Sequence, residues 1–213
     1  MTSANYPGMP MVKDNDRAFQ ELKDMADYLL LHNRRILNRA DDSVIRFVDG
    51  KRAVIRRSRG FVPLPIGIPF EYNGLAVGAE LMNAFGVAKN GKVYPSQYIG
   101  NTGKVEVLEF MREAIAHFRK ILRVKNLDLI IADLHPSYNT TKLAMEMANE
   151  FEVELLQVQH HYAHIASVMA EKNLDSVIGG VALDGVGYGT DGNTWGGGEV
   201  CISATRTLNG LLT

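Results

Sequence analysis

The sequence is poor in the features that mark secreted, membrane-spanning and nucleic-acid-binding proteins. Cys201 is the only cysteine among 213 residues, which excludes an internal disulfide framework and fits a reducing cytoplasm. No apolar run approaches the roughly 20 residues that cross a bilayer, and residues 1–5 show neither a basic leader nor an apolar signal core. The formal net charge of -1 argues against nucleic-acid binding driven by bulk charge. We therefore expect a cytoplasmic protein with no membrane and no nucleic-acid partner.

Apolar residues make up 46% of the chain, enough for a sizeable core, and their spacing changes along the sequence. Asn90-Gly91 predicts a tight turn between two short strands, and a long amphipathic helix follows over 104–124. An antiparallel hairpin followed by alternating helices and strands predicts a mixed α/β sheet, in which 177–184 is a buried apolar strand. The expected strands are 75–79, 84–88, 93–96, 127–132, 153–158, 177–184 and 199–204, and the later helices are 140–150 and 160–172.

A proline-rich stretch divides the chain into two parts. Three prolines fall within residues 61–69, where they remove backbone donors and favour an extended connection. We assign residues 1–65 to the first part, 66–73 to a linker and 74–213 to the second part.

The first part contains a predicted helix and a predicted hairpin. Asp14 and its neighbours can cap the helix, and strands are expected at 43–48 and 53–57. The apolar stripe of the helix is expected to comprise Ala18, Leu22, Met25, Leu29 and Leu30.

The strongest chemical signal is a pair of histidines four residues apart, His160 and His164, in a predicted helix. On a helix this spacing puts both imidazoles on one face. Asp184 closes the apolar run at 177–184 and adds a carboxylate. Two imidazoles, one carboxylate and an open position form the pattern of a catalytic divalent-metal site, and imidazole suits zinc and iron. The alternative is that the histidines cap the helix or line a polar surface; His161 points about 100° away and is expected to support or pack.

A glycine-rich stretch follows Asp184 directly. Glycines let the backbone approach phosphate oxygens closely and point its amides at them. The stretch is neither a Walker loop nor a dinucleotide fingerprint, because no Lys-Ser/Thr pair follows. The alternative is a flexible hairpin between two strands. The glycines are Gly185, Gly187, Gly189, Gly192, Gly196, Gly197 and Gly198.

Weaker candidates lie elsewhere in the chain. Ser3 and Asn5 form an S-x-N pair whose hydroxyl and amide suit nucleotide oxygens if the segment is extended. Asp133 and His135 follow a predicted strand, at the position where site residues collect in open α/β sheets. The remaining candidates, each with a surface or turn alternative, are the possible anion-binding Arg56, Arg57 and Arg59 and the possible substrate-orienting Asn83.

Taken together, these motifs resemble one family, the HypF carbamoyltransferases of nickel–iron hydrogenase maturation. The resemblance extends along nearly the whole chain, and the motifs are specific in combination. The matching stretches are TSAN (2–5), ADDSVIR (40–46), RRSRGFVP (56–63), GAELMN (78–83), DLHP (133–136), VQHHYAHIAS (158–167), LDGVGYGTDG (183–192) and WGGGE (195–199).

The resemblance implies an α/β (mixed) fold in two parts. Residues 1–65 would be the C-terminal part of a YrdC-like α/β domain, and 74–213 the first lobe of an actin-like ATPase (RNase H-like) fold. The implied enzyme makes carbamoyl-adenylate from carbamoyl phosphate and ATP and passes the carbamoyl group to the C-terminal cysteine of its partner HypE. The implied cofactors are a divalent metal, zinc or iron, with ATP and Mg. A companion K-x-R motif and a second lobe are expected outside this chain, so we expect an incomplete site, and no catalytic residue is assigned.

The resemblance also implies roles for individual residues. Ser3 and Asn5 match the nucleotide-binding S-x-N pair, and His160, His164 and Asp184 match the metal ligands. The glycines expected on the nucleotide-phosphate side are Gly185, Gly187, Gly189 and Gly197.

Three other functions stay open at this point. Related domains carry out threonylcarbamoyl-adenylate chemistry for tRNA modification, which an acceptor assay would separate from thiol carbamoylation. The chain would otherwise be a non-catalytic module that binds metal and docks HypE, or a sugar-kinase-like ATPase. Exposed sheet edges favour a homo-oligomer.

Overall fold

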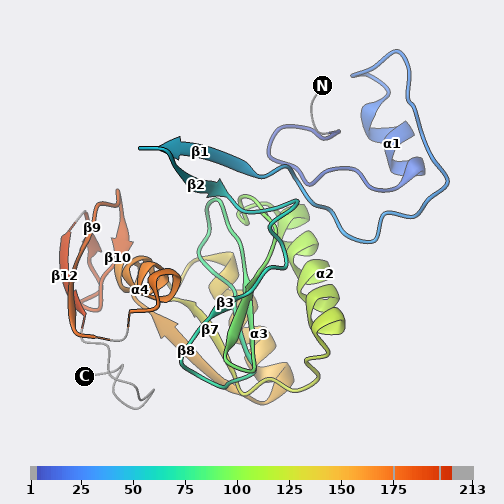
Figure 1. The fold of residues 1–213 in the computed structure, drawn as a ribbon. Helices are drawn as coiled ribbons and strands as arrows, with labels where there is room; N and C mark the ends of the chain where they lie inside the picture. Colours follow the sequence, from blue (N-terminus) through green and yellow to red (C-terminus); the bar gives the residue numbers. More distant parts are fainter. Residues whose placement is uncertain (1–3, 175, 197, 203–213) are drawn as a thin grey trace.

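A six-stranded mixed sheet organises the chain, in a computed structural model that describes residues 4–174, 176–196 and 198–202 (Figure 1). The strands are β3 (Ile66–Gly67), β4 (Gly74–Ala76), β5 (Gly86–Lys89), β6 (Lys92–Pro95), β7 (Leu129–Asp133) and β8 (Glu154–Val158). Their order is β3-β6-β5-β4-β7-β8; the first four pair antiparallel, whereas β4, β7 and β8 pair parallel. This is the mixed α/β sheet that the sequence predicts.

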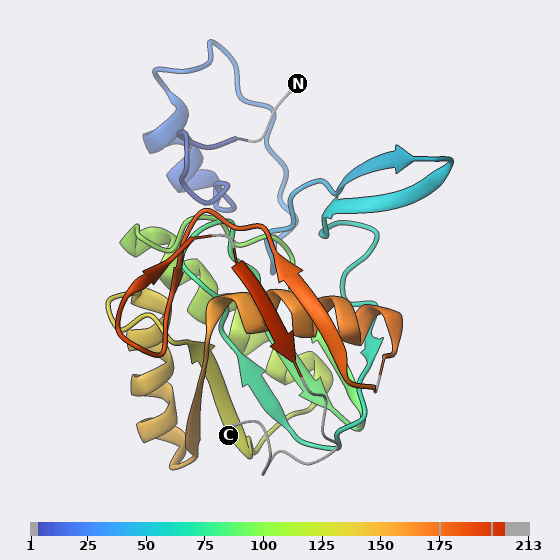
Figure 2. The ribbon, with the colours of Figure 1, turned by 90° about the vertical axis from the view of Figure 1, so that its left-hand side faces the viewer.

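Helices cover both faces of this sheet. α2 (Val105–Leu122) and α3 (Asn139–Phe151) lie on one face, and α4 (His160–Lys172) lies on the other. Beyond α4, β9 (Ile178–Ala182) and β12 (Gly198–Ile202) pair antiparallel as a separate two-stranded sheet. Figures 1 and 2 show α4 between the two sheets, where it can present side chains to both.

The main apolar core lies between the six-stranded sheet and the helices α2 and α3. Phe118 of α2 meets Phe85 edge to face, with ring centroids 5.2 Å apart. The predicted face of α2 is confirmed, because helical spacing brings each of its apolar residues to the sheet in turn. The buried ones are Val107, Met111, Ala114, Ile115 and Phe118, with Leu122 partly buried against the same core.

The first part of the chain contributes little to this core, against which only Val62 of its described residues packs. The helix α1 (Asn15–Leu22) buries Ala18 and Leu22, but it ends before the rest of the predicted stripe. Met25 is 51% exposed and Leu30 is fully exposed, so the longer helix expected from the sequence is wrong. A helix gains most of its stability from a packed face, and the described residues offer Met25 and Leu30 no such surface.

Two hairpins form as the sequence predicts. β1 (Val44–Val48) and β2 (Lys51–Arg56) pair antiparallel around Asp49-Gly50, and every residue of β1 is exposed. At Asp49-Gly50 and at Asn90-Gly91 both residues have positive φ, which is the geometry that Asp-Gly and Asn-Gly favour in two-residue turns. Figures 1 and 2 show the β1–β2 hairpin projecting away from the main sheet.

Arg39 fastens the first part of the chain to α2. Its side chain is 7% exposed, donates from Nε to the Met11 carbonyl oxygen at 2.6 Å, and pairs through Nη1 with Glu113 at 3.0 Å. Its guanidinium also lies over the Phe110 ring. Lys13 is a second partner of Glu113, with its Nζ 2.7 Å from the carboxylate. The hydrogen bond from Lys13, together with the charges of Lys13 and Arg39, lowers the pKa of Glu113, because these effects outweigh its partial burial.

Replacing Arg39 by alanine is expected to lower the free energy of unfolding by about 1–3 kcal/mol, because the Met11 carbonyl loses its donor and Phe110 loses its cover. Chemical denaturation measures the change. Arg35→Ala, at an exposed position nearby, is the control and should leave the unfolding midpoint unchanged. Equal midpoints for both variants would show that Arg39 does not fasten the segment.

Two further features differ from the sequence expectation. The apolar run at 177–184 forms β9, but it is not buried: Val177 is 68% exposed, Val181 61% and Leu183 91%. Only one side of this strand packs on α4, so apolar composition alone overstated its burial. The residues predicted as a linker begin with β3, which pairs with β6 in the main sheet. No helix in the described part of the chain is long and apolar enough to cross a membrane.

Candidate metal and nucleotide site

The start of α4 and the segment that follows β9 bring His160, His164 and Asp184 together. His160 Nε2 lies 2.9 Å and His164 Nε2 3.2 Å from the same oxygen, Asp184 Oδ2. One ligand atom from each residue falls within 4.8 Å of the others. The two imidazole rings are nearly perpendicular, at 87° with centroids 4.8 Å apart, so the rings do not stack and their Nε2 atoms both face Asp184. The four-residue spacing of His160 and His164 therefore places both imidazoles on one face of the helix, as the sequence predicts.

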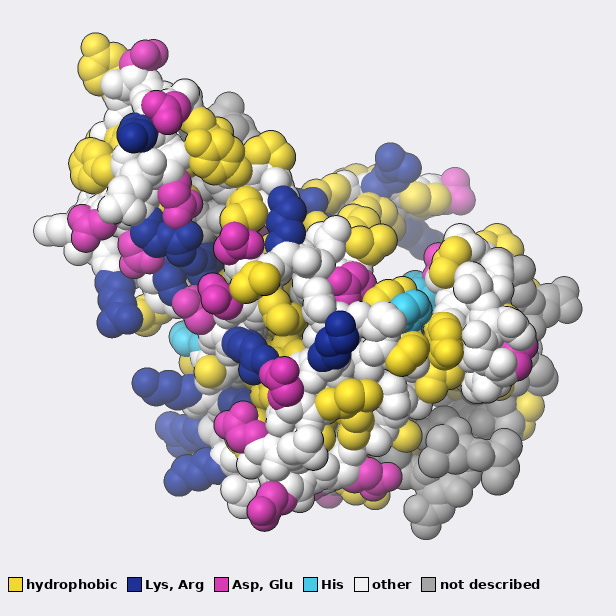
Figure 3. Space-filling view, turned by 180° about the vertical axis from the view of Figure 1, so that it is seen from behind, with side chains coloured by type: hydrophobic (Ala, Val, Ile, Leu, Met, Phe, Trp, Pro, Cys, Tyr) yellow, Lys and Arg dark blue, Asp and Glu magenta, His cyan; other side chains and the backbone are white. Residues whose placement is uncertain are grey.

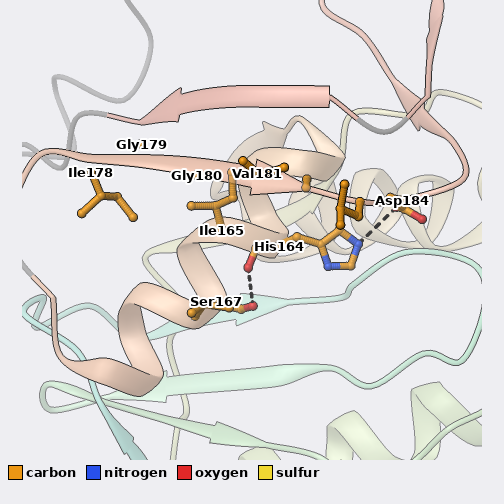
Figure 4. Close-up of a pocket in the computed structure, with 11 residues that line it drawn as sticks. His164, Ile165, Ser167, Ile178, Gly179, Gly180, Val181 and Asp184 are labelled. Atoms are coloured by element: carbon orange, nitrogen blue, oxygen red, sulfur yellow. Dashed lines mark hydrogen bonds and ion pairs between the residues drawn. The ribbon is translucent and has the colours of Figure 1, made fainter.

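Local sequence explains why these elements meet. Gln159 caps α4, because its side-chain oxygen accepts a hydrogen bond from the Tyr162 backbone N–H at 3.0 Å. Gly180 lets β9 approach the helix: an ideal Cβ there would lie 2.5 Å from Ile165. Figure 4 shows His164 on α4 and Asp184 after β9 pointing toward each other across this contact.

Asp133 contacts His160 on the side of the ring opposite Asp184. It ends β7, is 5% exposed at its side chain, and contacts His160 Nδ1 through Oδ2 at 2.6 Å. Its other oxygen accepts from the His135 backbone N–H at 2.8 Å. A carboxylate on the outer nitrogen of an imidazole orients the ring and leaves Nε2 for a metal ion. The sequence placed Asp133 at a strand end but gave no sign that it would support His160, because the contact spans 27 residues.

The charges of this cluster shift its pKa values in opposite directions. The hydrogen bond to Asp133, reinforced by the charges of Asp133 and Asp184, outweighs burial and raises the pKa of His160. Burial of Asp184 would raise the pKa of this carboxyl, but the Gly185 amide and the two imidazoles outweigh burial and lower the pKa. When His160 is protonated, its two ring N–H groups contact the Asp133 and Asp184 carboxylates, and a cation at Nε2 would take the place of the proton there.

The donor set fits a zinc or iron ion. Two imidazole nitrogens and a carboxylate oxygen suit either metal, and the supported His160 ring is the arrangement that such ligands usually have. His164 is 56% exposed at its side chain, so the site is open to solvent. A cavity of about 460 Å³ between α4 and β9 is lined by both His164 and Asp184 (Figure 4). Histidine atoms reach the surface beside apolar side chains in the space-filling view (Figure 3).

The glycine-rich stretch folds into a small hairpin beside the cluster. β10 (Gly187–Tyr188) and β11 (Thr194–Trp195) pair antiparallel, and the Gly189 N–H donates to the Asn193 carbonyl at 2.8 Å. The hairpin that the sequence offered as an alternative is therefore present, and it packs against His160 and His161 at the start of α4. Gly185 is exposed after Asp184, whereas Gly197 lies outside the described residues.

Asn5 of the S-x-N pair lines a cavity other than the one beside the histidines, whereas Ser3 is outside the described residues. Asn5 donates from Nδ2 to the carbonyl oxygens of Tyr6 and Met9, both at 2.9 Å, and its buried Oδ1 has no partner among the described residues. Asn5 helps to line a cavity of about 210 Å³ between the first part of the chain and residues 98–110.

The remaining sequence candidates serve as contacts within the fold. Arg56 pairs with Asp41 at 3.2 Å and covers the Tyr98 ring. Asn83 is 3% exposed and donates to two backbone carbonyls of its own loop, so it orders a turn. Arg57 donates to the Leu64 carbonyl and Arg59 to the Ala40 carbonyl.

An aromatic group next to the cluster was not foreseen from the sequence. The His135 ring stacks on Tyr138 with centroids 4.0 Å apart and lies 5.2 Å from the Tyr188 ring. Burial, followed by the charges of Asp133, Glu80 and Asp184, raises the pKa of Tyr138. Only the strand-end position of Asp133 and His135 pointed here, because Tyr138 precedes α3 whereas Tyr188 belongs to β10, 50 residues later in the sequence.

Comparison with known proteins agrees with this architecture. Residues 71–171 match the family model described as the HypF Kae1-like domain, and residues 1–58 match a model described as telomere recombination. The probable carbamoyltransferase HypF of Methanocaldococcus jannaschii is 49% identical over 201 residues, and the carbamoyltransferase HypF of Rhizobium leguminosarum is 42% identical over 206. These alignments cover 92% and 96% of this chain but only 26% of each relative.

Solved structures show the same relationship. A crystal structure of HypF from T. kodakarensis matches with a TM-score of 0.88 and 93% identity, covering 93% of this chain and 26% of that one. A full-length HypF in a phosphate- and nucleotide-bound form matches with a TM-score of 0.87 and 41% identity, covering 95% and 26%. The chain thus spans about a quarter of the length of the proteins it matches. On this evidence the chain belongs to the HypF carbamoyltransferase family.

Proposed function

We propose that this chain supplies the metal ligands and a phosphate-facing hairpin for a HypF-type carbamoyl transfer. In the proposed reaction, carbamoyl phosphate and ATP give carbamoyl-adenylate, and the carbamoyl group then passes to the C-terminal cysteine of HypE. The observation that carries the proposal is the convergence of His160, His164 and Asp184 on one point. Membership of the family supports the choice of reaction, and a relative bound to phosphate and nucleotide supports the use of ATP.

Each residue of the cluster has a separate part in this proposal. His160 and His164 would hold a divalent zinc or iron ion through Nε2, and Asp184 would hold it through Oδ2. When bound, the ion would neutralise phosphate charge and polarise the oxygen attached to it. Asp133 would keep the His160 ring oriented through Nδ1, and the hairpin of residues 185–196, beside the site, is the proposed phosphate-facing element.

Asn5 belongs to a second proposed nucleotide contact, with Ser3, in the first part of the chain. The cavity that it lines is walled on the other side by residues of the second part, including Tyr98 and Asn101. A nucleotide there would lie between the two parts, and the unpartnered Oδ1 of Asn5 supplies an acceptor for it.

The test combines a binding measurement with a turnover measurement. The purified chain is titrated with Zn²⁺ and, without oxygen, with Fe²⁺. It is then mixed with ATP, carbamoyl phosphate and HypE, and the mass of HypE is measured. Stoichiometric metal binding is the expected result for this chain, and a gain of one carbamoyl group on the HypE cysteine would show that the chain also has transferase activity on its own.

Two outcomes would redirect the proposal. Metal-loaded chain that binds HypE without modifying it would indicate a docking module, for which the partial length of the chain is the supporting observation. Transfer of a threonylcarbamoyl group to tRNA, in a parallel reaction supplied with ATP, threonine, bicarbonate and tRNA, would indicate threonylcarbamoyl-adenylate chemistry. Absence of metal binding would remove the basis of the proposed site.

A further inference from the structure

His161 lies between the proposed ligands in sequence but faces away from them, into the protein. It is 1% exposed, and its Nδ1 lies 3.5 Å from Gln159 Nε2, which also donates to the Tyr188 carbonyl at 3.3 Å. Gln159 Oε1 accepts from the Tyr162 N–H, and this contact turns the amide nitrogen toward His161. The other ring nitrogen of His161, Nε2, faces the glycine-rich hairpin.

The glycine-rich hairpin closes directly over this Nε2. An ideal Cβ at Gly187 would lie 2.8 Å from His161 Nε2, so any larger residue at 187 would push the hairpin off the helix. The Trp195 ring lies nearly parallel to the His161 ring, at 23° with centroids 6.4 Å apart, and its Nε1 donates to Asp191 at 3.0 Å. The buried His161 Nε2 has no hydrogen-bond partner in the described part of the chain. Its place in the fold is thus determined by packing on the hairpin.

We propose that His161 is a positioning residue that holds the hairpin of residues 185–196 against the start of α4. Because His161 directly follows His160, the same helical turn directs the His160 imidazole to the metal cluster and the His161 imidazole to the hairpin. The orientation of the helix end thereby sets the distance between the cluster and the hairpin backbone. The proposal deepens the proposed function, on which it rests for the role of the hairpin in facing phosphate, but the packing itself can be tested without metal or nucleotide.

Trp195 is the only tryptophan of the chain, so its fluorescence reports on the hairpin directly. In His161→Ala we expect Trp195 emission to shift to longer wavelength and quenching by acrylamide to increase, because the half-buried ring loses its neighbour. Zinc affinity should stay within about tenfold of the unsubstituted chain, since no ligand is removed. Tyr162→Phe, on the same turn but exposed, is the control and should change neither quantity.

A second pair of variants tests the contact from the other side. Gly187→Ala places a methyl group against His161 and should shift Trp195 emission in the same direction, whereas Gly179→Ala, whose Cβ meets nothing within 4 Å, should not. Unchanged emission in both His161→Ala and Gly187→Ala, with native circular dichroism, would overturn the proposal. Loss of zinc binding by more than about 100-fold in His161→Ala would also overturn it, because His161 would then act as a ligand. If the unsubstituted chain binds no zinc, the proposed function fails while the emission result still decides the role of His161.

Discussion

Replacing His160 by asparagine is expected to weaken zinc binding by more than about 100-fold while leaving the fold intact. Loss of a residue that hydrogen-bonds to a metal ligand typically weakens metal binding by about 10–100-fold, so loss of the ligand itself should weaken it more. In the unsubstituted chain, His160 Nδ1 lies 2.6 Å from Asp133 Oδ2. The Nδ2 of the asparagine occupies nearly the same position and can still donate to Asp133. Competition with a chromophoric chelator measures the affinity.

His160→Ala is the informative companion to this variant. It removes the ligand and also leaves the buried Asp133 carboxylate without its side-chain partner, which we expect to lower the free energy of unfolding by at least about 1–3 kcal/mol. His117→Asn, on α2 across the main sheet, is the matched histidine control and should bind zinc normally. Zinc affinity in His160→Asn equal to that of the control would rule out His160 as a ligand.

The sequence predicted the parts of this site that depend on one element at a time. The four-residue spacing of His160 and His164 needs only a helix, and α4 forms over the predicted residues 160–172. The turn at Asn90-Gly91 and the amphipathic face of α2 were equally local. Such features follow from backbone geometry and side-chain period, which a single sequence carries.

Features that depend on how elements meet were missed or wrong. The contact of Asp133 with His160 joins the end of β7 to the start of α4, and nothing local to either segment requires it. The apolar run of β9 was expected to be buried, but composition cannot tell a core strand from one with a single packed side. The glycines at 187 and 189 suggested phosphate contact, whereas the structure also gives them a packing reason against His161 and Trp195.

The proton on His160 makes metal affinity and the stability of the metal-free chain respond to pH in opposite directions. Because Asp133 raises the pKa of His160 above its ordinary value of 6.5, the contact stabilises the metal-free fold fully below 6.5 and less as pH rises through the raised pKa. Zinc needs an unprotonated Nε2, so its affinity should fall by about tenfold for each unit that pH drops below that pKa. Chelator competition and thermal unfolding between pH 5.5 and 8.5, a span of about three units, follow the two trends.

Asp133→Asn separates two effects of the Asp133 carboxylate: it orients the His160 ring, and it raises the pKa of His160. At pH 8, where protons compete little, loss of the orienting charge should weaken zinc binding by about 10–100-fold. At pH 6 the gap to the unsubstituted chain should narrow, because the His160 pKa is no longer raised by Asp133 and fewer imidazoles must lose a proton. An equal gap at both pH values would mean that Asp133 orients the ring without controlling its proton. A gap that widens at pH 6 would show that Asp133 does not raise the pKa of His160 and would contradict the proposed proton competition.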